Sequence, residues 1–423
     1  MLDRTQFPAF GKIEKIDLLE PKVHHLDNGL PVFCINAGAQ DVIKVELVFG
    51  IGTATDDLLT ASTTVRLLTE GTGKRSAAEI AESVDFYGAH IQNEVSHDES
   101  SLSLFTLNKH LKNTIGTLAE VYSDPSFLER EVETYVLKSQ QEMLVNQEKV
   151  SYLASKAFSA TLFGAQHPYG RSAEVSDYEK LNRGRLIDFH QRHIHNALNY
   201  ILVSGKLNDQ TLVELNTHFG QASRSTHEKE IIKIGRSEKH LVHVEKADAV
   251  QNAIRMGRVL FARTHADYVG MQMLCTVLGG YFGSRLMANI REDKGYTYGI
   301  NAGMVSLKNS GHLSISTEVG ASVCDAAINE IHFEIERIRK DLIPTQELEL
   351  VRNYMLGSIL KSIDGPFNIA SKWKGYIKHD LGLNAHHDLI RQVRTMTPEQ
   401  LRILANKYLQ KDELILITAG RSN

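Results

Sequence analysis

The stretch "LIDFHQRHIHNALNYILVSGKL" at residues 186–207 decides the fold, because its pattern occurs twice in one chain. It predicts a helix, a short loop and then an apolar strand that ends at Gly205. The C-terminal stretch "LRILANKYLQKDELILITAGR" at 401–421 has the same order of elements and ends at Gly420, 215 positions later. An offset of that size indicates two copies of one structural unit.

A second pair of segments repeats at a similar offset. Residues 109–123 ("KHLKNTIGTLAEVYS") and 324–338 ("CDAAINEIHFEIERI") both carry apolar side chains every three or four positions, which predicts amphipathic helices. Each follows an alternating run that predicts a strand, "SLSLFTL" at 101–107 and "HLSISTE" at 312–318. The order of strand and then helix is therefore repeated as well.

The first copy opens with the signals of a paired sheet. Asn28-Gly29 lies between two apolar runs and predicts a tight hairpin turn, and residues 42–52 ("VIKVELVFGIG") predict a buried strand. Ser76 and Glu79 form the capping box that starts a helix. Strands joined by turns and followed by helices predict an α+β fold of two homologous domains, each a mainly antiparallel sheet with helices packed on one face.

The length of the chain also requires more than one core. With 423 residues, of which 42% are hydrophobic, the chain is too long for a single ordinary domain. The segment 220–235 ("GQASRSTHEKEIIKIG") is polar and charged, which favours a linker at that point. We therefore expect an N-terminal domain at 1–220, a linker at 221–235 and a C-terminal domain at 236–423.

Composition excludes several classes of function. The 47 basic residues are balanced by 51 acidic ones, so nucleic acid is not an expected partner. No run of about 18 apolar residues is present, so membrane insertion is not expected. The first residues lack the basic start and apolar core of a signal peptide, which favours the cytoplasm, or the periplasm if a leader has been removed. Three widely spaced cysteines, Cys34, Cys275 and Cys324, predict reduced thiols.

Taken together, the motifs resemble the insulinase/pitrilysin family of zinc peptidases, in the short-chain branch that includes the mitochondrial processing peptidases. The resemblance covers nearly the whole chain and rests on the order and spacing of the motifs rather than on any single one. It implies an insulinase-like half clam-shell made of two homologous domains. The motifs are "LDNGLPVF" (26–33), "EGTGKRSAAEIAESVDFYGA" (70–89), "LFGAQHPYGR" (162–171), "LVSGK" (202–206), "LGGYFGSRL" (278–286) and "REDKGYTYG" (291–299).

The zinc motif of that family is degenerate in this sequence. In the family, a helix carries His-x-x-Glu-His, a Glu in a later helix is the third ligand, and the first Glu is the general base. The resemblance places the three motif positions at Ser62, Val65 and Arg66 and the third ligand at Gln140, and residues 26–89 contain no histidine. It therefore implies a chain that binds no metal and no other cofactor, and that has no catalytic residues of its own for hydrolysis.

Arg291 and Tyr298 match a second family feature. In the family, an Arg and a Tyr seven residues apart in the second domain reach a zinc site built by the first domain of a facing half, where they bond substrate carbonyls and the developing oxyanion. Gly295 is expected to end a helix, and alternation after it predicts that Tyr296 and Tyr298 share one face of a strand. Without the family, Arg291 would be interpreted as a solvated cation and Tyr298 as a half-buried sheet aromatic.

Three other candidate sites are weaker. His190, His193 and His195 could form a metal site, but the second copy of the repeat builds the same architecture without imidazoles. Cys34 has no base near it in the sequence, which disfavours a thiol nucleophile. The glycine-rich run 278–284 ("LGGYFGS") lacks the lysine of a phosphate-binding loop and is more typical of a packing corner.

These observations lead to one hypothesis and one alternative. The hypothesis is a non-catalytic, substrate-binding subunit of a two-chain insulinase-like zinc peptidase, paired with a homologous His-x-x-Glu-His subunit that carries the zinc and helping it to degrade or process unfolded peptides. The peptide would add a strand to a sheet edge, here 89–96, which carries Gln92-Asn93 instead of the usual Asn-Ala. A homodimer is possible when the chain is alone. The alternative is a structural or assembly protein of the same fold with no role in proteolysis.

Overall fold

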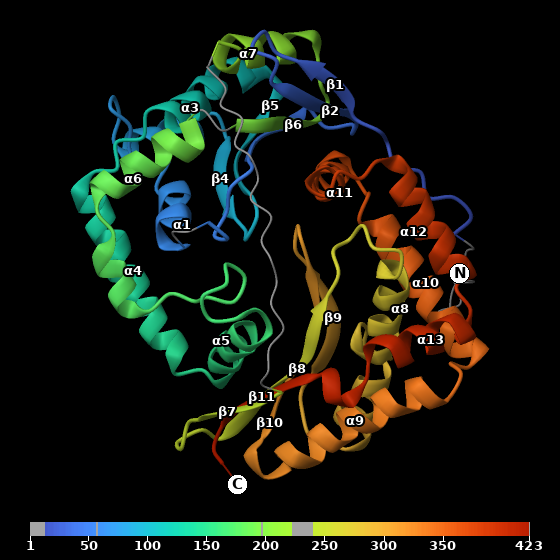
Figure 1. Ribbon diagram of the computed structural model, residues 1–423. Coiled ribbons are helices and arrows are strands. Elements are labelled where there is room, and N and C mark those ends of the chain that lie inside the picture. Colours follow the sequence, from blue (N-terminus) through green and yellow to red (C-terminus); the bar gives the residue numbers. More distant parts are fainter. Residues whose placement is uncertain (1–12, 56–57, 196–197, 222–239, 423) are drawn as a thin grey trace, which may run out of the picture.

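The computed structural model describes residues 13–55, 58–195, 198–221 and 240–422. These residues form two sheets, with strand order β1-β2-β6-β3-β5-β4 in the first and β7-β11-β8-β10-β9 in the second (Figure 1). The first sheet consists of β1 (Lys22–His25), β2 (Pro31–Asn36), β3 (Val42–Phe49), β4 (His90–Val95), β5 (Ser100–Leu107) and β6 (Leu198–Gly205). The second consists of β7 (Leu241–Glu245), β8 (Gln251–Leu260), β9 (Ile300–Ser306), β10 (Gly311–Gly320) and β11 (Ile415–Gly420).

Thirteen α-helices accompany these sheets in the described part of the chain. In the first half of the chain they are α1 (Leu58–Arg66), α2 (Ala77–Asp85), α3 (Leu111–Ser123), α4 (Glu129–Gln147), α5 (Val150–Phe163), α6 (Arg183–His190) and α7 (Asp209–Phe219). In the second half they are α8 (Tyr268–Gly279), α9 (Cys324–Lys340), α10 (Thr345–Lys361), α11 (Pro366–Lys378), α12 (Leu383–Thr395) and α13 (Pro398–Tyr408). Both sheets are mainly antiparallel, with single parallel pairings of β2 with β6 and of β7 with β11, so the predicted α+β fold is confirmed.

The internal repeat of the sequence is also a repeat of structure. Strand β6 ends at Gly205 and β11 ends at Gly420, and both glycines have positive φ angles, 127° and 145°. A Cβ atom on Gly205 would lie 2.2 Å from the carbonyl oxygen of Val42, and one on Gly420 would lie 2.1 Å from Oδ1 of Asn252. Both positions therefore require glycine for the same two reasons, a left-handed backbone and a close neighbour.

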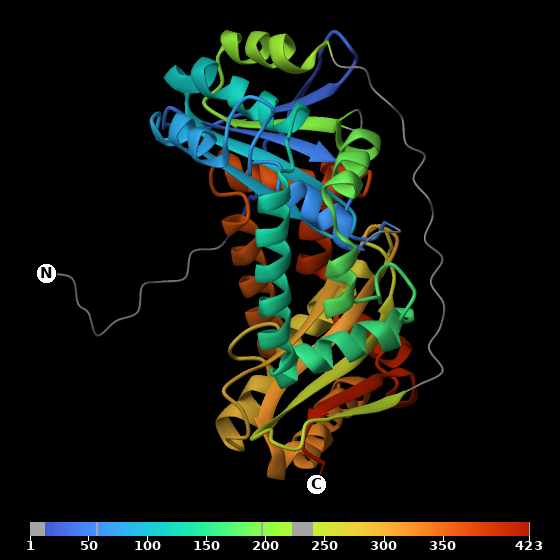
Figure 2. The same cartoon turned by 90° about the vertical axis from the view of Figure 1, so that its left-hand side faces the viewer.

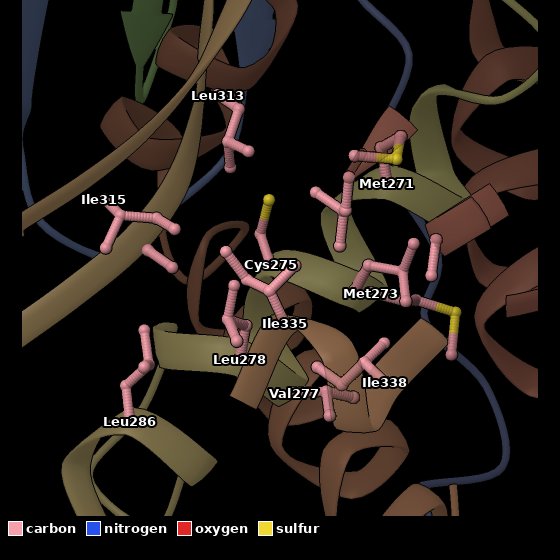
Figure 3. Packing of buried hydrophobic residues seen from close by; sticks show 14 of the residues in the cluster. Met271, Met273, Cys275, Val277, Leu278, Leu286, Leu313, Ile315, Ile335 and Ile338 are labelled. Carbon is pink, nitrogen blue, oxygen red and sulfur yellow. The ribbon is translucent and has the colours of Figure 1, made fainter. Parts of the chain in front are cut away.

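The predicted order of strand and then helix is present in both halves. Strand β5 leads into α3, and β10 leads into α9, each through one short 3₁₀ turn. Helix α3 buries Ile115 and Leu118 in the core of the first half, and α9 buries Ile331 and Ile335 in the core of the second. Figure 3 shows this second core, where side chains of α8 and α9 meet Leu313 and Ile315 of β10.

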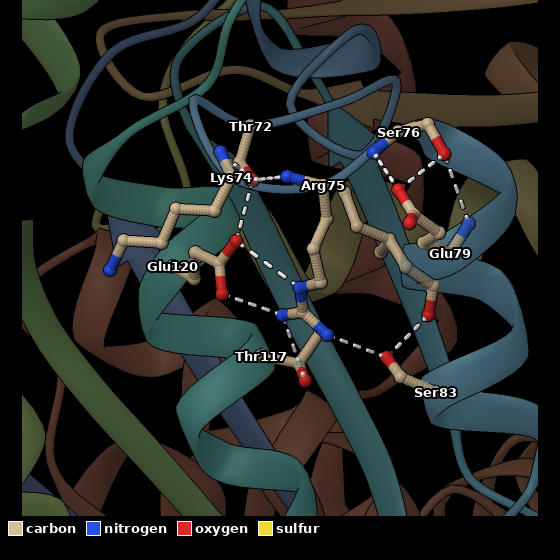
Figure 4. A network of polar contacts seen from close by, with 9 residues as sticks. Thr72, Lys74, Arg75, Ser76, Glu79, Ser83, Thr117 and Glu120 are labelled. Carbon is tan, nitrogen blue, oxygen red and sulfur yellow. Dashed lines mark hydrogen bonds and ion pairs between the residues drawn. The ribbon is translucent and has the colours of Figure 1, made fainter.

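Within the motif at 70–89, Arg75 is the centre of a network of polar contacts that holds the loop in place. Its guanidinium forms a forked ion pair with Glu120 on α3, with nitrogen to oxygen distances of 2.7 and 3.2 Å, and donates 2.9 Å to the hydroxyl of Ser83 on α2. The predicted capping box is present beside it, with Ser76 and Glu79 exchanging hydrogen bonds at the start of α2 (Figure 4). This network fixes the loop after α1 onto the helices α2 and α3.

One helix from each half packs on the sheet of the other half. Helix α5 lies on β8 and β11, where Phe158 joins a core cluster with Ile417. Helix α11 lies on β2 and β6, where Trp373 joins a cluster with Ile35. The sheet face opposite each main helical layer is therefore partly covered as well. Helix α4 carries the chain from the first sheet toward the second (Figure 2).

The proposed linker at 221–235 lies almost wholly outside the described residues, so the domain boundaries remain predictions. Cys34, Cys275 and Cys324 are buried free thiols, in agreement with the prediction of reduced cysteines. Among the described residues, no helix combines the length and the apolar character needed to cross a bilayer.

Candidate functional site

The three positions that the family resemblance assigns to the zinc motif, Ser62, Val65 and Arg66, lie in the C-terminal half of α1. Val65 is 1% exposed and packs into the core of the first half, so its side chain does not face solvent. The Ser62 hydroxyl donates back to its own helix, to the carbonyl oxygens of Leu58 at 3.3 Å and Leu59 at 3.1 Å. Arg66 is exposed. The accessible end of the helix therefore presents a cation.

Gln140 lies on α4 and contacts a different segment, the 3₁₀ helix η2 (Val175–Lys180). Its side-chain amide donates to the carbonyl oxygen of Val175 at 3.4 Å. Burial raises the pKa of Tyr178 in the same segment, and the positive charge of Arg66 opposes that rise, so Arg66 also lies near η2. Gln140 and Arg66 therefore approach η2 from different helices, and neither residue brings a metal ligand.

The residues at these positions do not fit a zinc ion. Zinc in proteins is bound by thiolate, imidazole or carboxylate, and Ser62, Val65, Arg66 and Gln140 supply none of these groups. Within the described ranges, no group of three or more His, Cys, Asp or Glu side chains is placed to hold a metal ion. We therefore derive no hydrolytic step from this chain.

The weaker candidates from the sequence have structural surroundings. His190 is buried, and its Nε2 lies 2.8 Å from the carbonyl oxygen of Tyr122 on α3. Burial lowers the pKa of His190 to about 4, and the ring of His193 packs against Phe189 at 4.7 Å between centroids. Burial raises the pKa of the Cys34 thiol to about 11, which is the reverse of what a nucleophile needs.

Arg291 lies in the helical segment η4 (Met287–Asp293), which is a π-helix. Its guanidinium carbon stands over the ring of Phe282, 4.6 Å from the ring centroid. This cation–π contact holds the planar group in one orientation without neutralising its charge. The predicted end of the helix is confirmed, because Gly295 follows η4 with a φ of 65°.

Tyr298 lies in the segment between η4 and β9, and it is 95% exposed. The prediction that Tyr296 and Tyr298 share a strand face is wrong, because β9 begins only at Ile300. Tyr296 instead packs partly buried against the core of the second half. A local hydrogen-bonded turn between Thr297 and Gly299 takes the place of the predicted strand.

Thr297 makes that turn. Its hydroxyl lies 3.0 Å from the carbonyl oxygen of Gly299 and 2.8 Å from that of Glu318 on β10, and it accepts from the Gly299 amide at 3.1 Å. Thr317 of β10 also donates to the Gly299 carbonyl at 3.0 Å. The segment is therefore fastened to the sheet on both sides of Tyr298, while the tyrosine itself projects outward.

Phe282 connects Arg291 and Tyr298 to one region of the surface, because it contacts the first and lines a cavity with the second. Phe282 and Tyr298 both line a cavity of about 720 Å³, and Arg291 lies on the Phe282 ring. The cavity lies over the second sheet, and its wall includes Arg255 of β8, Ser316 of β10 and Asn301 of β9. The sequence indicated the Arg and Tyr pair, but it gave no signal for Phe282 or Arg255, which lie 9 and 36 positions before Arg291.

A second cavity, of about 630 Å³, lies along β4 in the first half. Strand β4 is the last strand in the order of its sheet, so the prediction that 89–96 forms an edge is confirmed. Asn93 of β4 donates to the carbonyl oxygen of Arg66 at 3.2 Å and so ties the edge to the end of α1. Lys374 of α11 lines this cavity and reaches Glu46 on β3.

Comparison with known proteins agrees with this architecture. Residues 33–173 match the family model described as Insulinase (Peptidase family M16), and residues 180–355 match the model described as Peptidase M16 inactive domain. The chain is 23% identical to a protein named uncharacterized zinc protease YmxG of Bacillus subtilis, over 84% of this chain and 86% of the relative. It is likewise 23% identical to a protein named non-peptidase homolog YmxG of Helicobacter pylori, over 82% and 81%.

The fold has close counterparts among solved structures. A peptidase M16 inactive domain from Pseudomonas fluorescens superposes with a TM-score of 0.87 at 21% identity, over 96% of this chain and 99% of that one. A protease from Helicobacter pylori superposes with a TM-score of 0.85 at 18% identity, over 94% and 99%. The two family models together span most of the sequence, from the second strand of the first sheet to helix α10. The chain therefore belongs to the insulinase family of peptidases, family M16.

Proposed function

We propose that this chain is a non-catalytic, substrate-binding subunit of a two-chain M16 zinc peptidase. A homologous subunit with the His-x-x-Glu-His motif would hold the zinc and supply the hydrolytic chemistry. The observation that carries the proposal is the side chain of Tyr298, which is 95% exposed at a cavity that Phe282, the ring beneath Arg291, also lines. The positions assigned to the zinc motif in the same chain hold no ligands.

The exposure of Tyr298 supports a role in contact with another molecule. A large aromatic side chain gains nothing for folding by projecting into solvent, yet the turn at Thr297 fixes its backbone with hydrogen bonds on both sides. A phenol can donate one directed hydrogen bond to an oxygen that becomes negative during peptide cleavage. Arg291, oriented by Phe282, can donate to peptide carbonyls.

The names of the relatives are consistent with a chain of this kind. The Helicobacter pylori relative is named a non-peptidase homolog, and residues 180–355 of this chain match a model described as an inactive domain. We extend that description to this chain because Ser62, Val65, Arg66 and Gln140 cannot bind zinc. The chain itself would then need no cofactor.

The alternative is a structural or assembly protein that has kept the fold. The reciprocal packing of α5 and α11 produces a firm two-half unit, which a scaffold would also need. A scaffold gives no reason for an exposed tyrosine on a fixed backbone at the cavity whose Phe282 ring carries Arg291. The substrate-binding proposal accounts for both the fold and this pair.

The test is reconstitution with the zinc-bearing M16 homologue encoded in the same genome. We expect peptide hydrolysis by the mixture that is at least about tenfold faster than by either chain alone. Equal activity of the homologue with and without this chain would favour the scaffold.

A further inference from the structure

The cavity beside Tyr298 contains a charged side chain that the proposed function does not use. Arg255 projects from β8 on the sheet face that α5 partly covers, and it is half-buried. Its guanidinium makes no hydrogen bond or ion pair with any residue that the structure describes. Burial lowers the pKa of Arg255, and the charge of Glu318 on β10 offsets this effect only in part. The guanidinium of Arg255 is therefore partly desolvated, faces the cavity and meets no acceptor from the described protein, so it is available to an anionic ligand.

The surroundings of Arg255 are polar and open toward Tyr298. Ser316 of β10 pairs directly with Arg255, and Asn301 of β9 pairs with Ser316. Paired residues of neighbouring strands carry side chains on the same face, so these three form a polar row across the sheet. All three line the cavity together with Tyr298.

Helix α5 adds a second positive element to the same wall. The helix begins at Val150, and Ser151 of its first turn lines the cavity. No side chain caps this end, since Lys149 at the N-cap position makes no capping hydrogen bond. The unpaired amides and the dipole at a helix N-terminus favour an anion. Ser151 therefore brings the first turn of α5 to the cavity wall that carries Arg255, and Glu318 is the one carboxylate among the described residues that line it.

We propose that the cavity lined by Arg255, Ser151, Ser316, Asn301 and Tyr298 binds a carboxylate of the peptide substrate, with Arg255 as its anchor. This inference rests on the proposed function, because it takes the ligand to be a peptide. The carboxylate comes either from an acidic side chain or from the C-terminus of the peptide. A guanidinium can bind both carboxylate oxygens at once, which a lysine cannot do.

The size of the cavity suits a short piece of extended peptide. A volume of about 720 Å³ is much larger than one carboxylate. The aromatic rings of Phe282 and Tyr298 offer apolar walls for the rest of a side chain. Because Tyr298 and Arg255 line the same cavity, the carboxylate would lie within roughly three residues of the peptide carbonyl that Tyr298 contacts, at about 3.4 Å for each residue.

The experiment uses the purified chain alone and measures fluorescence anisotropy. The probe is a short fluorescein-labelled peptide rich in Ala and Ser, made with a central Glu or Gln and with a free or amidated C-terminus. We expect peptides that carry a carboxylate in the preferred position to bind about 10- to 100-fold more tightly than the fully neutral peptide. The four peptides also show whether the bound carboxylate is the Glu side chain or the C-terminus of the peptide.

Variants connect that preference to Arg255. Arg255→Met should remove the difference between the charged and neutral peptides, and Arg255→Lys should keep part of it. Lys340→Gln, at the exposed end of α9, removes one positive charge elsewhere and should leave the preference unchanged. Circular dichroism reports whether each variant folds. If Arg255→Met does not fold, the comparison of the four peptides on the natural chain still tests whether the chain prefers a carboxylate.

The outcomes separate this inference from the proposed function. Equal binding of all four peptides would overturn the role of Arg255 and leave the substrate-binding role intact. Binding of none of them would overturn both. A carboxylate preference that survives in Arg255→Met would show that another residue is the anchor, which also overturns the inference.

Discussion

Lys374 on α11 donates a hydrogen bond to Glu46 on β3 across 328 positions of sequence, and so joins the second half of the chain to the first. The Glu46 side chain is 1% exposed and also pairs with Lys44 at 2.7 Å. Burial alone would raise the pKa of Glu46, but Lys374 and Lys44 hold it below its ordinary value. The carboxylate is therefore kept charged inside the protein because both lysines reach it.

Replacing Lys374 with Met should destabilise the protein by about 3 kcal/mol, because it leaves a buried carboxylate with only one partner. Denaturant unfolding followed by circular dichroism measures this loss. Arg391→Met, which breaks an exposed ion pair with Asp388 on α12, is the matched control and should change stability by less than about 0.5 kcal/mol. The double variant Glu46→Gln/Lys374→Met should lose less than the sum of the single changes. Additive losses would contradict the coupling.

Acid should weaken the fold through His190. Its folded pKa of about 4 lies below the ordinary value of 6.5, so the unfolded chain binds the proton more readily. The contribution of His190 to stability is therefore complete above about pH 6.5 and falls as the pH drops toward 4, by up to roughly 3 kcal/mol. His190→Gln should flatten the stability profile in that window. The exposed His24 of β1 is the control, and a His24→Gln variant should follow the natural profile. Parallel profiles for both variants would argue against this role.

Tyr298→Phe should lower kcat of the reconstituted pair by about 10²- to 10³-fold, the usual effect of removing one oxyanion donor. Arg291→Ala should also raise KM, because a guanidinium can hold ground-state carbonyls. Neither change should alter stability by more than about 1 kcal/mol, since Tyr298 is exposed and Arg291 lies on a surface ring.

The control for that experiment is Tyr296→Phe, which removes the same hydroxyl from a ring packed against the core. It should leave kcat unchanged. If Tyr298→Phe also leaves kcat unchanged while folding and assembly persist, the scaffold alternative takes the place of the proposal.

The purified chain should contain well under one zinc ion per molecule and should hydrolyse no peptide alone, because Ser62, Val65, Arg66 and Gln140 offer no ligand set. Elemental analysis and a peptide-cleavage assay measure the two quantities. Stoichiometric zinc together with activity that a chelator removes would contradict the prediction.

This chain should form a heterodimer of roughly equal subunits with its zinc-bearing homologue and a weaker homodimer when alone, because half of a chamber leaves an inner face and rim to be covered. Size-exclusion chromatography and pull-down test the association. A chain that stays monomeric in the presence of the homologue would count against the two-chain proposal.

The sequence by itself determined those features that depend on neighbouring residues. The repeat that ends at Gly205 and Gly420, the capping box at Ser76 and the end of η4 at Gly295 all follow from local backbone requirements, and all are present. The edge position of β4 was inferred from family resemblance and is also present. The prediction from sequence was wrong where a local hydrogen bond competed with the alternation of side chains. Alternation predicted a strand through Tyr298, but the hydrogen bonds of Thr297 form a turn there.

Only the tertiary structure decided which faces meet. Periodicity shows that α5 and α11 have apolar faces, but it cannot show that each packs on the sheet of the other half. Likewise, Glu46 and Lys374 look like ordinary surface charges in the sequence, and Arg255 and Phe282 carry no motif. Their roles arise from burial and from neighbours that are distant along the chain, and those contacts form only when the whole chain packs.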